Sequence, residues 1–211
     1  MNPAAIVALI FTGGFAIGDW SSRVRDDKRL EYVCKPGTLT ALIIVAVALD
    51  PASGASDRRT WFVAALVFSL VGDVLLMLPR DAFVAGLAAF LVAHVCYVVG
   101  FWTDPPAAIA MVVASTVVVL AVAPIARTVL RALASEPALR PPVAIYMVVI
   151  ATMVASAIAS GNVVAASGAV LFAASDSLIA WDRFVRPVAG AAVVIMVTYH
   201  LGQILLVLSL L

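Results

Sequence analysis

The chain has 211 residues, of which 64% are hydrophobic and only 12% are charged. Water-soluble domains are closer to half apolar and a quarter charged, so this composition excludes an ordinary soluble globular protein and indicates an integral membrane protein. The formal net charge of +1 gives no indication of a nucleic-acid partner.

A helix needs about 20 predominantly apolar residues to cross the hydrocarbon core of a bilayer. Apolar runs between charged or Pro- and Gly-rich breaks predict an all-α fold, a single transmembrane domain over residues 1–211 built as a bundle of eight helices. The predicted spans cover residues 2–18, 36–50, 60–78, 82–102, 106–130, 142–159, 162–181 and 188–210. The first run has no basic segment before it, so we interpret it as a span and not as a cleaved signal peptide. The polar segment between the first two spans is predicted to be a loop.

The distribution of positive charge supports this count of spans. If the spans alternate in direction, 11 of the 13 Lys and Arg residues fall on one side, in or beside the loops 19–35, 79–81, 131–141 and 182–187. The other side has only Arg58 and Arg59. The positive-inside rule then places both termini outside the cytoplasm.

Two aspartates interrupt membrane-grade apolar runs, Asp73 in "VFSLVGDVLLMLP" and Asp176 in "LFAASDSLIAW". Each lies five residues before the end of its predicted span, roughly 7 Å below the cytoplasmic boundary at the helical rise per residue. Lys35 and Tyr146 are expected at the same depth from two other helices. Because an ionisable residue within a span costs ~2.5–3.5 kcal/mol on insertion scales, we interpret this shared depth as a functional site.

Helical spacing places polar groups on the same faces as small and aromatic residues. The three faces are Ser69–Asp73, then Gly86–Phe90–His94 with Tyr97 beside it, and Gly168–Phe172–Asp176. Small residues such as Gly86 and Gly168 let membrane helices approach closely, so these faces predict an interior cavity.

Plainer explanations apply to several of these residues. A Lys at an interface often extends its ammonium to water, as Lys35 would here. His94, Tyr97, Tyr146 and Gln203 would each serve equally well in hydrogen bonds between helices, and we expect His200 to be structural. The cysteines Cys34 and Cys96 are expected to be packing residues. Asp19, Asp182 and the "RVRDDKR" cluster are predicted to be solvated or to face lipid headgroups.

Six segments resemble the YhhN family of membrane proteins, in order and over nearly the whole chain. They are "CKPGTLTAL", "FSLVGDVLLML", "FVAGLAAFLVAHVCYVVGF", "IYMVVIATM", "GAVLFAASDSLIAWDRF" and "TYHLGQILL". The family includes lysoplasmalogenases, which hydrolyse the vinyl-ether bond of lysoplasmalogen to a fatty aldehyde and a glycerophospho-base. The resemblance implies that Asp73 and Asp176 are catalytic and that Lys35 belongs to a Lys-Pro motif. It carries no role over to His200.

Vinyl-ether hydrolysis requires a protonated acid, a carboxylate and a water molecule. Two buried aspartates supply the first two if their surroundings keep one protonated and the other ionised. We interpret Asp73 as the acid and Asp176 as the ionised partner, an order that the sequence does not decide. No cofactor or metal is expected, and the expected partners are a lysolipid substrate and membrane lipids. The predicted substrate-binding residues are Lys35 (for the phosphate), Ser69, His94, Tyr97, Tyr146 and Ser175, with Phe90 and Phe172 along the chain tunnel.

Other functions stay open at this point. Asp73, Asp176, His94 and His200 would supply ligands for a metal-dependent, ceramidase-like lipid hydrolase. A small transporter would use the aspartates as a proton relay and would favour discontinuous helices. A purely structural scaffold leaves the matched depths of the acidic residues unexplained.

Overall fold

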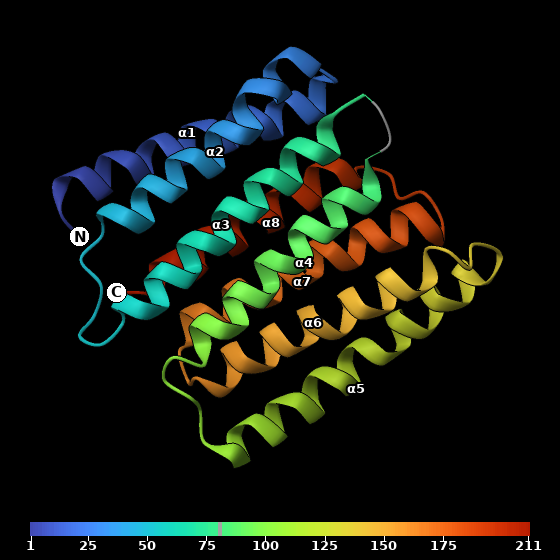
Figure 1. Cartoon of the computed structure of the whole chain (residues 1–211). Helices are drawn as coiled ribbons and strands as arrows, with labels where there is room; N and C mark the ends of the chain where they lie inside the picture. The colour runs from blue at the N-terminus through green and yellow to red at the C-terminus, as the bar shows by residue number, and fades with distance from the viewer. Residues whose placement is uncertain (80–81) are drawn as a thin grey trace.

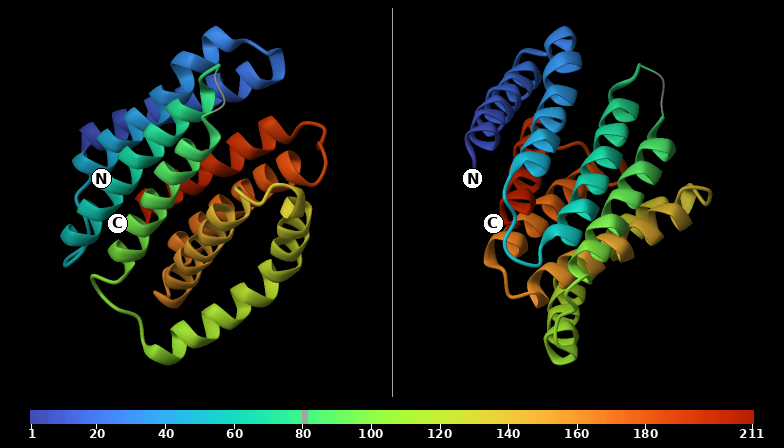
Figure 2. Two further views of the ribbon diagram at one scale, coloured as in Figure 1. Left: turned by 45° about the vertical axis from the view of Figure 1, so that its right-hand side comes forward. Right: turned by 60° about the vertical axis from the view of Figure 1, so that its left-hand side comes forward.

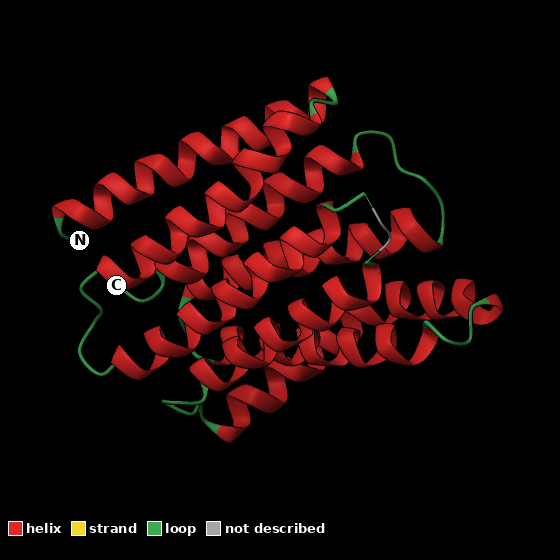
Figure 3. Ribbon diagram, turned by 45° about the horizontal axis from the view of Figure 1, so that its top comes forward, coloured by secondary structure: helices red, strands yellow, loops and turns green. Residues whose placement is uncertain are grey.

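The computed structural model describes residues 1–79 and 82–211, and within these residues all regular secondary structure is helical (Figures 1 and 3). The helices are α1 (Pro3–Arg25), α2 (Lys28–Ala48), α3 (Ser56–Met77), α4 (Phe83–Phe101), α5 (Ala108–Ala132), α6 (Arg140–Ala159), α7 (Val163–Phe184) and α8 (Ala191–Leu208), with a short 3-10 turn, η1 (Leu133–Ser135), after α5. In the described part of the chain, eight helices are long and apolar enough to cross a membrane. The predicted all-helical, eight-span architecture is therefore confirmed.

The outer surface of the bundle is apolar. On α5, large apolar side chains such as Ile109, Val112 and Leu120 are exposed. A continuous apolar face of this kind is unfavourable in water. It suits the hydrocarbon tails of lipids, which are themselves apolar.

Consecutive helices pack as antiparallel hairpins, α1 with α2, α3 with α4, α5 with α6 and α7 with α8 (Figures 1 and 2). Both chain termini lie at one end of the bundle, and the connections that follow α1, α3, α5 and α7 lie at the opposite end (Figure 1). Most Lys and Arg residues gather at this second end, called the charged end below. The predicted loop 79–81 falls largely on Arg80 and Asp81, which lie outside the described residues. Which end of the bundle faces the cytoplasm stays a prediction.

The predicted loop between the first two spans is wrong. Helix α1 continues to Arg25 and α2 already begins at Lys28, so only a two-residue turn separates them. Asp26 adopts a left-handed conformation with φ of 53° and ends α1, while the Asp27 carboxylate accepts hydrogen bonds from the Arg29 and Leu30 amides and starts α2. The hydropathy pattern did not reveal these helical turns, because it counts every charged residue as polar and takes no account of ion pairs formed inside the bundle.

Close approach of α7 and α8 depends on glycine. A Cβ atom on Gly168 would lie 2.8 Å from the Gly202 carbonyl oxygen and 2.9 Å from the Leu206 nitrogen, both backbone atoms that cannot move aside. A Cβ atom on Gly86 would instead meet the flexible Leu76 side chain at 2.5 Å. The predicted small-residue contact therefore requires glycine at position 168. This contact brings α7, which carries Asp176, close to the polar face of α8.

Candidate active site

A cavity of about 430 Å³ lies between the helices near the charged end. Its lining includes Asp73 from α3 and Asp176 from α7, together with Lys35 from α2 and Tyr146 from α6. These are the four polar groups that the sequence predicts at one depth, and the structure brings them around a single space. A volume of this size is within the range of small-ligand sites.

Asp73 sits in a charged environment. Its Oδ1 lies 3.1 Å from the Lys35 ammonium, and its Oδ2 accepts a 2.8 Å hydrogen bond from the Tyr199 hydroxyl. Both side chains of the Lys35–Asp73 pair are almost fully buried, at 7% and 3% exposure. An ammonium and a hydroxyl donor on the same carboxylate stabilise its ionised form.

Asp176 has neutral neighbours instead. Its Oδ2 accepts a hydrogen bond from the Tyr146 hydroxyl and lies 3.8 Å from His94 Nε2. Its side chain is 13% exposed, against 3% for Asp73, so it is the more open of the two carboxyls to the cavity.

The hydrogen bonds of His94 fix its tautomer. His94 Nδ1 lies 2.6 Å from the Phe90 carbonyl oxygen, and because a carbonyl only accepts, Nδ1 carries the hydrogen. In a neutral imidazole, Nε2 is then an acceptor, and this buried atom has no hydrogen-bond partner among the described residues. Two acceptors, Nε2 and the Asp176 oxygen, therefore face each other. At 3.8 Å the two atoms do not form a hydrogen bond, but a protonated, neutral Asp176 avoids placing a negative charge beside the Nε2 lone pair.

An aromatic wall lies beside the two carboxyls. Phe172 makes edge-to-face contacts with the His94 ring at 4.7 Å and the Tyr199 ring at 5.2 Å between centroids. Phe90 packs in the same way against Tyr199 at 5.8 Å. Because these rings are packed on one another, they hold the hydroxyl and imidazole groups of the site in place.

A polar network continues from the site toward the bundle interior. The Gln203 amide donates to Ser69 Oγ at 3.0 Å and to the Tyr199 hydroxyl at 3.5 Å, and its carbonyl accepts from the Tyr97 hydroxyl. The network links α3, α4 and α8 and orients Tyr199 toward Asp73.

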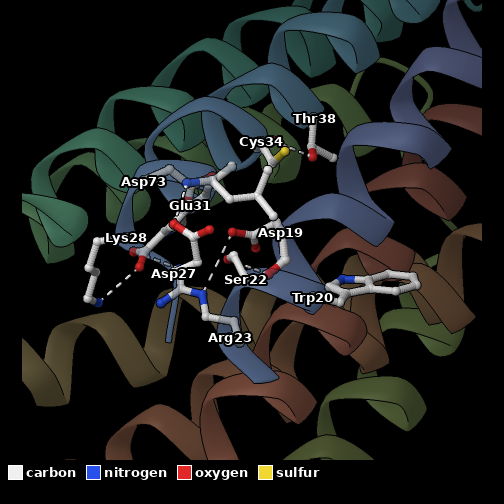
Figure 4. A network of polar contacts seen from close by, with 12 residues as sticks. Asp19, Trp20, Ser22, Arg23, Asp27, Lys28, Glu31, Cys34, Thr38 and Asp73 are labelled. Carbon is white, nitrogen blue, oxygen red and sulfur yellow. Dashed lines mark hydrogen bonds and ion pairs between the residues drawn. The ribbon is translucent and has the colours of Figure 1, made fainter. Parts of the chain in front are cut away.

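A cluster of ion pairs lies where α1 meets α2, and the Arg23–Glu31 pair joins the two helices (Figure 4). Arg23 Nη2 lies 3.0 Å from Glu31 Oε1, and Arg23 Nε lies 3.7 Å from Asp19 Oδ1. Glu31 also accepts from the Lys28 ammonium at 2.9 Å. Asp19 is completely buried, so the prediction that it is solvated is wrong. Its carboxyl lies beside the Arg23 guanidinium one turn further along α1, which offsets part of the cost of burying it.

The predicted substrate-binding residues divide into two groups. Those that line the cavity, within the residues the structure describes, are Lys35, Phe90, Tyr146 and Ser175. Those that lie behind the lining are Ser69, His94, Tyr97 and Phe172, which are all buried. His94 and Phe172 pack against the lining residues Tyr146 and Tyr199, and Ser69 and Tyr97 hydrogen-bond to Gln203. Ser175 lines the cavity but donates to the Ile195 carbonyl oxygen at 3.1 Å, so its hydroxyl joins α7 to α8.

Lys35 is not placed as expected. It lies within α2 and not at its start, and its ammonium is engaged by Asp73. The predicted phosphate contact of Lys35 stays a prediction.

Sequence reasoning missed Tyr199 and Arg23, which both line the cavity. The spacing of Tyr199 and Gln203, four residues apart in the last span, was a signal for a polar face on α8. Arg23 gave no such signal because its segment was interpreted as a loop. His200 instead accepts a 3.1 Å hydrogen bond from the Trp20 indole, a contact between α8 and α1 that fits the structural role expected for it.

The two rival site arrangements lack the features they need. Among the described residues, no three His, Cys, Asp or Glu side chains are grouped closely enough to hold a metal ion. Helices α3 and α7, which carry the two aspartates, run unbroken past both of them, whereas a transporter site would favour discontinuous helices.

The fold and site define an all-helical, membrane-spanning protein with a pair of buried carboxyls at one end of the bundle. The YhhN family model matches residues 30–210, so the chain belongs to the YhhN family and the predicted membership is confirmed.

Curated relatives carry the name lysoplasmalogenase. Lysoplasmalogenase TMEM86B of Homo sapiens is 41% identical over 147 residues, 69% of this chain and 61% of that protein. The Sus scrofa protein of the same name is 34% identical over 178 residues, 83% of this chain and 72% of that protein. Lysoplasmalogenase of Mycobacterium tuberculosis is 38% identical over 66 residues, 30% of this chain and 25% of that protein. These names agree with the enzyme class that the sequence predicts. No solved structure matches the chain significantly.

Proposed function

We propose that this protein is a membrane-embedded hydrolase that cleaves the vinyl-ether bond of lysoplasmalogen-type lysolipids, releasing a fatty aldehyde and a glycerophospho-base. The observation that carries the proposal is that Asp73 and Asp176 line one cavity but have different partners. Membership of the YhhN family and the names of the relatives support the same reaction.

The contacts favour a division of roles that is the reverse of the order expected from the sequence. Asp73 is the carboxylate, because Lys35 and Tyr199 both stabilise its negative charge. Asp176 is the acid, because a proton on its carboxyl avoids a negative charge beside the acceptor Nε2 of His94 and because Asp176 is the more open to the cavity.

The reaction then returns both acids to their starting states. Asp176 donates its proton to the β-carbon of the vinyl ether, which leaves an oxocarbenium ion beside the Asp73 carboxylate. A water molecule attacks the oxocarbenium carbon and gives one proton to Asp73, forming a hemiacetal. As the hemiacetal collapses, Asp73 protonates the departing glycerol oxygen and Asp176 takes the proton of the hemiacetal hydroxyl. The products are the aldehyde and the alcohol, and general acid–base steps of this kind contribute about 10²- to 10⁴-fold each.

The position of the cavity suits a lysolipid. It lies near the charged end of the bundle, which we assign to the cytoplasmic face of the cell membrane from the excess of Lys and Arg. A lysolipid keeps its headgroup at the interface and its chain in the hydrocarbon, so its ether linkage lies just below the surface. Apolar lining residues such as Leu87 and Ile150 provide a suitable surface for the chain.

The test is incubation of the purified protein with 1-alkenyl lysophospholipid and, separately, with 1-acyl lysophospholipids. We expect aldehyde release from the alkenyl substrate and no free fatty acid from the acyl substrates. Fatty acid release at a comparable rate would identify a lysophospholipase instead, and release of neither product would overturn the proposed reaction.

A further inference from the structure

Two pairs of polar residues face each other where α3 meets α8. Ser69 and Asp73 lie one turn apart on α3, and Tyr199 and Gln203 lie one turn apart on α8. The Tyr199 hydroxyl contacts Asp73 at 2.8 Å, and the Gln203 amide contacts Ser69 at 3.0 Å. Because the two helices run in opposite directions, the contact between Ser69 and Gln203 lies one turn deeper in the bundle than the contact between Asp73 and Tyr199.

The partners of Tyr199 fix the direction in which its hydroxyl points. A phenol has one hydrogen, and the Asp73 carboxylate, which Lys35 stabilises in its ionised form, only accepts. The Tyr199 hydrogen therefore points to Asp73. The Gln203 atom that faces the Tyr199 oxygen, at 3.5 Å, then has to be a donor, and the amide nitrogen is that donor.

Two further residues hold the Gln203 amide in this orientation. Its carbonyl oxygen accepts a hydrogen bond from the Tyr97 hydroxyl on α4, and its nitrogen also donates to Ser69 Oγ. Ser69, Tyr97 and Gln203 have no exposed surface, so each depends on the others for its hydrogen bonds. An amide turned by 180° would place its oxygen against the Tyr199 oxygen, and these two acceptors would have no hydrogen between them.

We propose that Gln203 is a positioning residue that acts through Tyr199: its amide donates to the Tyr199 oxygen and so keeps the hydroxyl hydrogen on the Asp73 carboxylate. The inference rests on the proposed function, because it takes Asp73 as the ionised partner. A hydroxyl that accepts one hydrogen bond becomes a stronger donor in the next, since consecutive hydrogen bonds polarise one another. Gln203 thus stabilises the Asp73 carboxylate without touching it.

Asp73 also has ionisable neighbours that a change at Gln203 leaves in place. Those that line the cavity with it are Arg23 on α1, Lys35 on α2, Tyr146 on α6, Asp176, Asp182 and Arg183 on α7, and Tyr199 on α8. Behind the lining, His200 packs against the Tyr199 ring at 5.3 Å between centroids. Of the lining groups, Tyr199 is the one that hydrogen-bonds to Gln203 among the described residues, so the effect of Gln203 on Asp73 has to pass through it.

A double-mutant cycle on kcat tests this route. Q203M keeps the size of the side chain but removes the amide, and it should lower kcat for aldehyde release by about threefold to tenfold, with KM within about twofold. In Y199F, which has no hydroxyl to position, adding Q203M should lower kcat by less than about twofold. A Gln203 that only joins the helices would lower kcat by the same factor in both backgrounds, and that result would overturn the proposal.

Infrared titration gives a second measurement that needs no substrate. The carbonyl band of the protonated Asp73 carboxyl should grow on acidification, and it is assigned by its loss in D73N. In Q203M the midpoint of this titration should move to higher pH by about half a unit to one unit, because the carboxylate loses part of its stabilisation. S156A is the matched control. The buried Ser156 hydroxyl also joins two helices, by accepting from the Trp102 indole near the opposite end of the bundle, and S156A should titrate like the wild type.

A second variant keeps the test available if Q203M folds poorly. Q203M/Y97F also removes the Tyr97 hydroxyl that Q203M leaves without its acceptor, and it should show the same shift of the Asp73 midpoint. An unmoved midpoint in the folded variant would overturn the role of Gln203, even in an active enzyme. A moved midpoint in a protein that releases no aldehyde from the alkenyl substrate would support the role of Gln203 and overturn the proposed function.

Discussion

Asp73 and Asp176 enter the cavity from α3 and α7 with the same functional group, but their neighbours differ in charge. Asp73 faces an ammonium and a hydroxyl, whereas Asp176 faces a hydroxyl and the acceptor nitrogen of a neutral imidazole. In a low-dielectric interior such differences decide which carboxyl holds a proton, because burial weakens the screening of charges by solvent. One site can therefore hold one protonated and one ionised carboxyl at the same pH.

The comparison also explains why both residues stand so deep in apolar helices. A carboxylate alone would be costly there, so Lys35 accompanies Asp73 on the neighbouring helix. A neutral carboxyl needs only a hydrogen-bond partner, and Tyr146 supplies one for Asp176.

The largest expected effect is loss of activity on replacing either carboxyl. D73N and D176N should each reduce kcat for aldehyde release by about 10²- to 10⁴-fold, because each removes one partner of the acid–base pair. Purified variants are compared on 1-alkenyl lysophospholipid, with D104N at the opposite end of the bundle as a control that keeps full activity. Full activity in D73N or D176N would remove that residue from the mechanism.

The stability of the folded protein should depend on the Lys35–Asp73 ion pair. K35M leaves the Asp73 carboxylate buried without its ammonium, so the free energy of unfolding should fall by about 3–5 kcal/mol, whereas K35M/D73N should recover most of that loss. Thermal unfolding in detergent measures both variants. K28M is the matched control, because Lys28 is 63% exposed and its pair with Glu31 should contribute about 1 kcal/mol or less. If K35M/D73N were no more stable than K35M, the Asp73–Lys35 pair would not be the origin of the loss.

The sequence predicted the number of helices and the meeting of Lys35, Asp73, Tyr146 and Asp176, because both follow from where apolar runs begin and end. It did not predict the buried ion pairs of α1 and α2. Hydropathy scores Asp19 and Arg23 as single polar residues, and only the packed structure shows that their charges compensate each other.

The roles of the two aspartates were equally beyond the sequence. Both follow a serine or glycine in an apolar run, and nothing in those runs distinguishes them. The distinction comes from Lys35, Tyr199 and His94 on three other helices, and it depends on which atom of each faces which carboxyl.

His94 offers a sharper test of the proton on Asp176. H94F keeps an aromatic ring against Phe172 and Tyr146 but removes the acceptor nitrogen, so kcat should fall by about tenfold to a hundredfold. The pH at which kcat/KM is half-maximal should also move, since the acceptor nitrogen beside the Asp176 carboxyl is lost. H200F, which removes the other buried histidine, should leave that pH unchanged. An unaltered pH profile in H94F would mean that His94 only packs against the site.

The smallest expected difference lies between the two hydroxyls that contact the carboxyls. Y146F removes the hydroxyl that donates to Asp176 and destabilises the carboxylate that forms when Asp176 gives up its proton, so kcat should fall by about tenfold to a hundredfold. Y199F should lower kcat by less, about threefold to tenfold, because Lys35 still stabilises Asp73. Steady-state kinetics on the alkenyl substrate measures both, with Y32F as the control because Tyr32 is exposed on α2 and is not among the cavity-lining residues. A larger loss in Y199F than in Y146F would reverse the comparison, since it would mean that the charge on Asp73 depends more on a hydroxyl than on the ammonium beside it.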